Sequence, residues 1–189
     1  MALTLGTHAG FVLIAPTEVP TGIIQQVNSY NSGVRDTTPS GSIHITEIGF
    51  YNTNANDVAN FEVGIYAADT GSPGGTASLL EVSRTNIKTS GSGWKRATVD
   101  WTINGDTLYW INIFVSNTTG GSTASRVAAS GGGGNVVKVS QTTLANPYPA
   151  SPNVYEAVGI EAIYALIEVI PPPIPGAGIS NSLLFGEDF

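Results

Sequence analysis

Residues 93–115, GWKRATVDWTINGDTLYWINIFV, decide the fold class of this chain. In the first half of the stretch, Trp101 is in phase with Val99 and Ile103, which is the period-2 pattern of a strand with one buried face. Asn104–Asp106 supplies turn residues, and the second half is apolar on both faces, as in a central strand. The stretch therefore predicts two consecutive antiparallel strands, the second inside a sheet.

Strand-like runs of the same kind flank this pair, and turn-forming stretches such as ADTGSPGG separate them. The runs are FVLIA (11–15), IHITEIGFY (43–51), NFEVGIYA (60–67), SLLEVSR (78–84) and NVVKVS (135–140). The alternation changes at Glu47–Ile48, which predicts a bulge or a bend. About eight short strands separated by turns predict an all-β fold, an antiparallel β-sandwich that is most simply a jelly roll.

The predicted core is made of apolar residues that share one strand face. They are Phe61, Val63, Ile65, Val99, Trp101, Ile111 and Ile113. Residues 154–170, VYEAVGIEAIYALIEVI, allow either a buried helix or a long strand. Gly159, the β-branched residues and the all-β surroundings favour the strand. Residues 116–135 are rich in Gly, Ser and Thr and predict a long loop.

Three parts of the chain follow from these patterns. Residues 1–42 are expected to form an extended N-terminal segment with one short edge strand at residues 11–14. Residues 43–170 are expected to form the β-sandwich, and residues 171–189 a Pro-rich C-terminal arm.

The C-terminal arm combines a stiff, proline-rich spacer with a terminal peptide that is both apolar and acidic. Pro171–Pro173 and Pro175 predict an extended polyproline-like path. The residues expected to contact a neighbouring subunit are Ile179, Leu183, Leu184, Phe185, Glu187, Asp188 and Phe189. We expect the arm to bind a neighbouring chain by strand addition or in an apolar groove; the alternative is a tail folded back on its own sandwich.

Composition excludes several classes of partner. The 189 residues carry a formal net charge of −7, and Lys95–Arg96 is the only adjacent pair among seven cations. Nucleic acids and anionic membranes both require clustered cations, so neither is an expected partner. The chain has no cysteine, which excludes disulfides and thiolate metal sites. The N-terminal residues lack the basic region of a signal peptide, and assembly in a host cytoplasm is expected.

The histidines and carboxylates give no strong catalytic pattern. His8 and His44 lie far apart and at no ligand spacing, so no metal site is predicted. A Ser–His–acid triad stays open, because its members need not be neighbours in sequence, but no nucleophile-elbow motif is present. The carboxylates that alternate with apolar residues are expected on a solvated sheet face rather than in a glycosidase pair. They are Glu47, Glu62, Glu81 and Glu161.

Two loops contain Asp residues that could supply oxygen ligands for calcium. Asp57 and Asp69 lie in such loops, but Asx residues also stabilise turns through backbone hydrogen bonds, and that interpretation is favoured. Gly131–Gly134 is expected to be a flexible connection, because no Lys–Ser/Thr pair follows it as in a phosphate loop. No cofactor and no enzymatic activity are predicted.

The three tryptophans separate into core and surface candidates. Trp110 lies in the two-sided apolar strand and Trp101 is in phase with buried neighbours, so both are expected in the core. Trp94, beside Gly93 at the start of a strand, is the one candidate for a glycan-stacking platform; core packing is the favoured alternative.

The segments ITEIGFY, NFEVGIYAADTGSPGG, SGWKRATVDW and TLYWINIFV together resemble a known family. They are similar to β-sandwich, jelly-roll-like modules of tailed-bacteriophage virion accessory proteins and related bacterial surface proteins. The matching positions are Gly64–Tyr66, Gly71–Gly75, Gly93–Trp94 and Tyr109–Trp110, within residues 43–115. The resemblance implies attachment to a virion or a cell surface, and no catalysis.

Two functions are therefore expected from the sequence. The first is a virion structural protein, such as a capsid decoration protein or head fibre, that binds itself as a homo-oligomer and contacts other virion proteins. The alternative is a carbohydrate- or host-receptor-binding module of a phage fibre or adhesin, with Trp94 as its platform.

Overall fold

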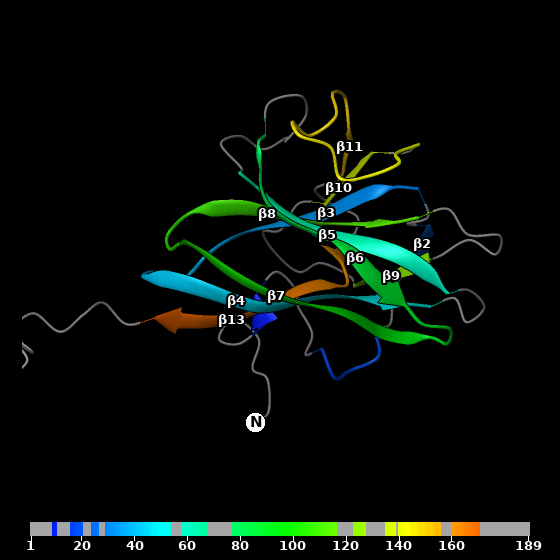
Figure 1. Cartoon of the computed structure of the whole chain (residues 1–189), viewed down its shortest axis with the longest axis horizontal. Helices are drawn as coiled ribbons and strands as arrows, with labels where there is room; N and C mark the ends of the chain where they lie inside the picture. The colour runs from blue at the N-terminus through cyan, green and yellow to red at the C-terminus, as the bar shows by residue number, and fades with distance from the viewer. Residues whose placement is uncertain are drawn as a thin grey trace, which may run out of the picture.

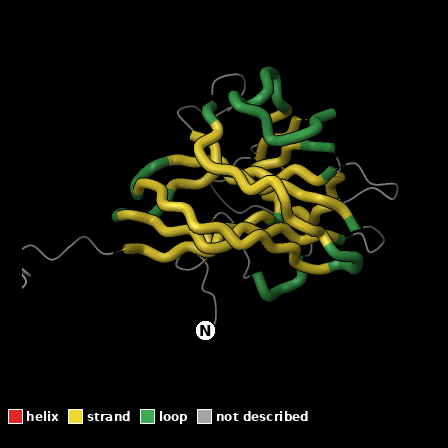
Figure 2. Tube along the Cα trace, viewed as in Figure 1, coloured by secondary structure: helices red, strands yellow, loops and turns green. Residues whose placement is uncertain are grey.

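The computed structural model of the chain describes residues 9–10, 16–20, 24–26, 29–53, 58–67, 77–116, 123–127, 135–138, 140–155 and 160–170. Within these ranges every regular element is a β-strand, and no helix occurs (Figure 2). The strands form two antiparallel layers packed face to face (Figure 1). The predicted all-β sandwich is confirmed. In the same ranges, no helix is long and apolar enough to cross a membrane.

One layer, called the β4 sheet, is built around the long strand β4. It contains β1 (Ala9–Gly10), β13 (Ile163–Ile170), β4 (Ser42–Asn52) and β7 (Gly93–Asn104) in that order. Beyond Ile163, the first residue of β13, the β4 sheet continues with shorter strands. They are β9 (Thr123–Val127), β12 (Ile160–Glu161) and β2 (Ile24–Gln26).

The other layer, called the β8 sheet, has six strands. In spatial order they are β11 (Asn153–Tyr155), β10 (Asn135–Lys138), β3 (Asn31–Thr37), β8 (Leu108–Val115), β5 (Ala59–Ala67) and β6 (Leu79–Lys88).

The order of the eight principal strands is that of a jelly roll. The β4 sheet contributes β1-β13-β4-β7 and the β8 sheet contributes β3-β8-β5-β6, while the chain alternates between the sheets from β3 to β5 and from β6 to β8. This is the two-sheet Greek-key arrangement of jelly-roll domains. The predicted bulge is present as well, because the register of β4 against β7 shifts between Ile45 and Glu47.

The core lies between the two sheets and is made by the inward faces of their strands. Six of the seven predicted core residues are buried there; the seventh, Trp101, packs against the cluster but is only partly buried. Trp110 is fully buried, but on the outer face of the β8 sheet instead of between the sheets. At about 25 cal/mol per Å² of apolar area, this interior is the main source of stability.

Three expectations from the sequence need correction. The boundary at residue 42 is wrong, because β3 pairs with β8 and β10 inside the sandwich. The β3 sequence, NSGVRDT, has little β propensity, but the strand requires Gly33: an added Cβ would lie 2.4 Å from Nδ2 of Asn112 on the next strand.

Residues 154–170 are extended as expected, but the described part divides into β11, β12 and β13. The predicted loop 116–135 contains β9. The predicted edge strand at 11–14 lies outside the described residues.

Candidate functional site

A loop of the chain itself covers much of the outer face of the β8 sheet. Residues 140–152 run across this face, on the upper side of the molecule in Figure 1. Leu144 and Tyr148 of this loop are fully buried against outward-facing residues of the sheet. The resulting second apolar cluster contains Tyr66, Ala77, Trp110, Phe114, Leu144 and Tyr148. Large side chains on the outer face of β5 and β8 are thus shielded from water by the loop.

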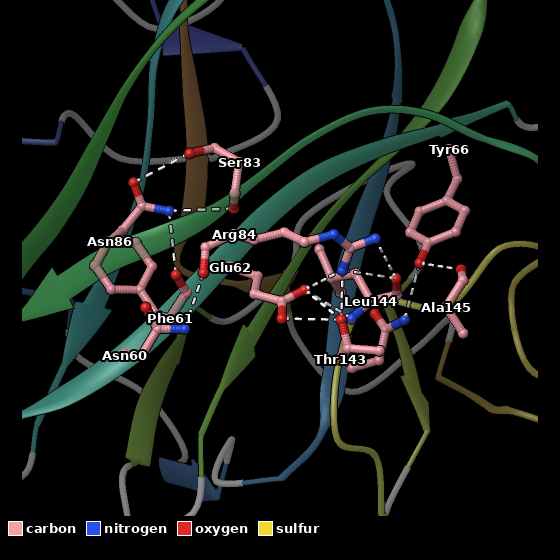
Figure 3. Close-up of polar contacts among 11 residues, drawn as sticks. Asn60, Phe61, Glu62, Tyr66, Ser83, Arg84, Asn86, Thr143, Leu144 and Ala145 are labelled. Carbon is pink, nitrogen blue, oxygen red and sulfur yellow. Dashed lines mark hydrogen bonds and ion pairs between the residues drawn. The ribbon is translucent and has the colours of Figure 1, made fainter.

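The carboxylate of Glu62 fastens this loop to the sheet (Figure 3). Its Oε2 accepts hydrogen bonds from the backbone N–H of Leu144 at 2.9 Å and from the guanidinium of Arg84 at 2.7 Å. The hydroxyl of Thr143 lies 2.8 Å from the same oxygen and also contacts Arg84. We call Glu62, Arg84, Thr143 and Leu144 the Glu62 clamp.

The position of Glu62 in β5 explains this role. Phe61 and Val63 point into the sandwich core, so Glu62 points outward, where the loop covers it and leaves it only 6% exposed. The expectation of a solvated sheet face is therefore wrong for Glu62. A buried carboxylate needs paired, hydrogen-bonded surroundings, and the clamp provides them. With its oxygens occupied by three donors, the carboxylate is held in a structural role.

A second set of hydrogen bonds continues from the clamp under the same loop. The Tyr66 hydroxyl donates to the carbonyl of Ala145 at 2.7 Å, and Asn31 Nδ2 donates to the Tyr66 oxygen at 3.3 Å. Asn112 Nδ2 donates to Asn31 Oδ1 at 2.7 Å, and the Tyr148 hydroxyl donates to the Asn31 carbonyl at 3.0 Å. Burial raises the pKa of Tyr66, so its hydroxyl remains a neutral donor.

The outer face of the β4 sheet carries an aromatic group centred on Trp94. Its ring meets the rings of Tyr51 and Tyr164 edge to face, with centroids 5.4 and 5.2 Å away. Gly49 leaves room for the ring of Tyr164, because an added Cβ at Gly49 would lie 2.5 Å from Cε1 of that ring. The indole N–H donates to the carbonyl of Glu18 at 2.9 Å.

Residues 16–20 lie against this aromatic group from the outside and act as a strap. Pro16 and Pro20 are buried, and the guanidinium of Arg96 donates to the Pro16 carbonyl at 3.5 Å. The Tyr164 hydroxyl donates to Glu47, whose carboxylate lies 3.9 Å from Arg96. Burial, followed by the contact with Glu47, raises the pKa of Tyr164. Trp94, the candidate glycan platform, is therefore half-buried and already engaged by the chain itself.

His44 lies farther along the same outer face, as the alternation predicts. Its Nε2 is 2.7 Å from a carboxylate oxygen of Asp100 on β7, and its Nδ1 is 3.8 Å from Glu168 on β13. The hydrogen bond to Asp100 is the main cause that raises the pKa of His44 above 6.5. Both ring nitrogens face carboxylates, so the arrangement ties three strands together.

Several predicted sites cannot be placed. All contact residues of the arm, Ile179, Leu183, Leu184, Phe185, Glu187, Asp188 and Phe189, lie outside the described residues. His8, Asp57, Asp69 and Gly131–Gly134 lie outside them as well. Among the residues that are described, no group of three His, Asp or Glu side chains has the geometry to hold a metal ion.

The sequence did not predict the Glu62 clamp. Glu62 and Thr143 are 81 positions apart, and nothing in the local pattern of either segment connects them.

No protein-family model matches the chain, and no curated protein or solved structure does either. The function must therefore be argued from the chain's own residues.

Proposed function

We propose that this protein is a non-enzymatic structural component of a virus particle, a decoration or head-fibre type of protein that binds neighbouring subunits. The supporting observation is the strand order, because jelly rolls are common in viral capsid domains.

The covering of the two sheets favours contacts through strand edges and arms. Loop 140–152 covers outer-face side chains of the β8 sheet, and residues 16–20 cover the aromatic group of the β4 sheet. The broad sheet faces are thus partly occupied by the chain itself. The C-terminal arm then supplies the apolar contacts to a second copy and to other virion proteins, and neither nucleic acid nor a membrane is a partner.

The direct test is localisation on a purified particle by cryo-electron microscopy with a tagged copy of the chain. The proposal expects density at defined, symmetry-related positions on the particle surface. Absence of the tagged protein from particles that are otherwise complete would contradict it.

A glycan-binding module is the second candidate, favoured by the partly exposed ring of Trp94 near the Glu47–Arg96 pair; Tyr51 and Tyr164 are buried and hold this ring in position. Aromatic rings next to paired polar groups suit a sugar ring, and lectins also use jelly rolls. A glycan array with wild type and Trp94→Ala distinguishes the two functions. Saturable binding that the substitution abolishes would support the glycan site, whereas no binding by the wild type would remove it.

A further inference from the structure

One side of the sandwich is formed by the last strands of both sheets. β6 ends the β8 sheet and β7 ends the β4 sheet, and the two follow each other along the chain. Among the described residues, β6 pairs only with β5 and β7 only with β4. Within the part of the chain that the structure describes, each therefore has one edge without a strand partner, where another strand can pair.

β7 is the longer of these two edges and the more regular. It has 12 residues, and its register against β4 shifts once, whereas the register of β6 against β5 shifts twice. Irregularities of this kind hinder the addition of a further strand. By this criterion β7 is the better acceptor.

The open side also leaves apolar surface uncovered at β7. Trp101 faces the core in phase with Val99 and Ile103, yet it is only partly buried whereas they are buried. A side chain that lay beside β7 would cover the remaining surface of the indole.

Lys95 provides a second feature, near the start of β7. Its side chain faces inward and is 7% exposed, and its Nζ contacts the Thr89 hydroxyl and the Ser90 carbonyl, both at 3.3 Å. Among the described residues no carboxylate pairs with it, and burial lowers its pKa. A buried ammonium group without an anion is unfavourable, so this end of β7 favours a negatively charged occupant.

The arm begins at the opposite end of β7. Ile170, the last residue of β13, pairs with Ser42 of β4, which in turn pairs with Asn104, the last residue of β7. β13 and β7 are two strand spacings apart, about 10 Å. If residues 171–175 follow the polyproline path that their sequence predicts, they span about 15 Å, which takes the residues after them past the chain's own β4 sheet toward a second copy.

We propose that the open edge of β7 is the acceptor for the C-terminal arm of a second copy, residues 177–188, added as an antiparallel strand. This inference rests on the proposed function and names the surface that the arm binds. In a 12-residue antiparallel register, the arm starts opposite Asn104 and ends opposite Gly93. Leu183 then lies opposite the exposed Thr98, and Glu187 and Asp188 lie opposite Trp94 and Gly93, next to the buried Lys95 at the start of β7.

Disulfide trapping tests this pairing in full-length chains, because the protein has no cysteine of its own. One copy carries Leu183→Cys, and it is mixed with a second copy that carries Thr98→Cys on β7. The matched control is Thr85→Cys, the same exchange at an exposed position on the competing edge strand β6. Each variant alone is oxidised in parallel, and products are separated on non-reducing gels.

The proposal expects a cross-linked heterodimer with Thr98→Cys and its loss with Thr85→Cys. Adding Glu187→Gln and Asp188→Asn to the arm should reduce the yield of this heterodimer, and high salt should reduce it less in that variant than in the wild-type arm. A heterodimer with Thr85→Cys instead would overturn the β7 acceptor but leave arm-mediated assembly intact. No heterodimer with either copy would overturn both. An intramolecular link when Leu183→Cys and Thr98→Cys are combined in one chain, without intermolecular product, would overturn exchange between copies.

Discussion

Replacing Glu62 with alanine is expected to destabilise the fold by about 2–4 kcal/mol. The substitution removes the acceptor for the buried N–H of Leu144, 2.9 Å away, and such an unpaired donor costs about 1–3 kcal/mol. It also removes the partner of Arg84 at 2.7 Å; because the Arg84 side chain is 46% exposed, water replaces much of this contact. The Thr143 hydroxyl loses its acceptor as well, which brings the sum into the stated range.

Urea denaturation followed by tryptophan fluorescence measures this change, because Trp110 is buried beneath the loop that the clamp holds. Glu81→Ala is the matched control, an exposed glutamate on the neighbouring strand β6, and it should change stability by less than about 0.5 kcal/mol. Limited proteolysis should cut within residues 140–152 faster in Glu62→Ala than in Glu81→Ala. If Glu62→Ala unfolds within about 0.5 kcal/mol of the wild type, the clamp does not hold the loop and the reasoning is refuted.

Three further predictions concern other parts of the sandwich. Trp101→Ala should cost about 2–3 kcal/mol, below the usual range for a fully buried tryptophan, and a loss under about 0.5 kcal/mol in urea would show that the indole does not pack on the core. Gly33→Ala should lower the free energy of unfolding by about 1–3 kcal/mol, because the new methyl group collides with the Asn112 side chain; an unchanged midpoint in urea would contradict this close approach. His44 contributes stability below its ordinary pKa of 6.5, and this contribution disappears as pH rises through the raised pKa of the folded state. The difference in stability between wild type and His44→Gln should therefore shrink from pH 5.5 to pH 8, and a difference that grows with pH would refute the pairing with Asp100.

The strands that could be predicted from sequence are those whose alternation is local. Phe61, Val63 and Ile65 show their shared face within five residues, and the structure confirms it. β3 was missed because NSGVRDT owes its place to Gly33 and to pairing with β8, and neither appears in a hydrophobic pattern. The candidate sites were harder still. The alternation predicted that Glu62 faces outward, but only the packing of a loop some 80 positions later makes that face an interior.

Trp94 shows the same limit on the other sheet. Its position beside Gly93 left an exposed platform and packing in the core as alternatives, with packing favoured; the structure places the ring on the outer face, where it packs against Tyr164. The strap at residues 16–20 and the ring of Tyr164 on β13 come from distant parts of the chain. Their contacts depend on the jelly-roll order of the strands, which local sequence patterns do not encode.

Sedimentation of the full chain and of a chain that lacks residues 174–189 tests the central claim, that the arm joins neighbouring subunits, most directly. The described core clusters lie within residues 34–167, so the shortened chain should still fold; the full chain should unfold at a higher urea concentration, because assembly stabilises its folded state. The account predicts that the full chain sediments as an oligomer and the shortened chain as a folded monomer. Equal sedimentation of the two folded chains, in either state, would contradict it.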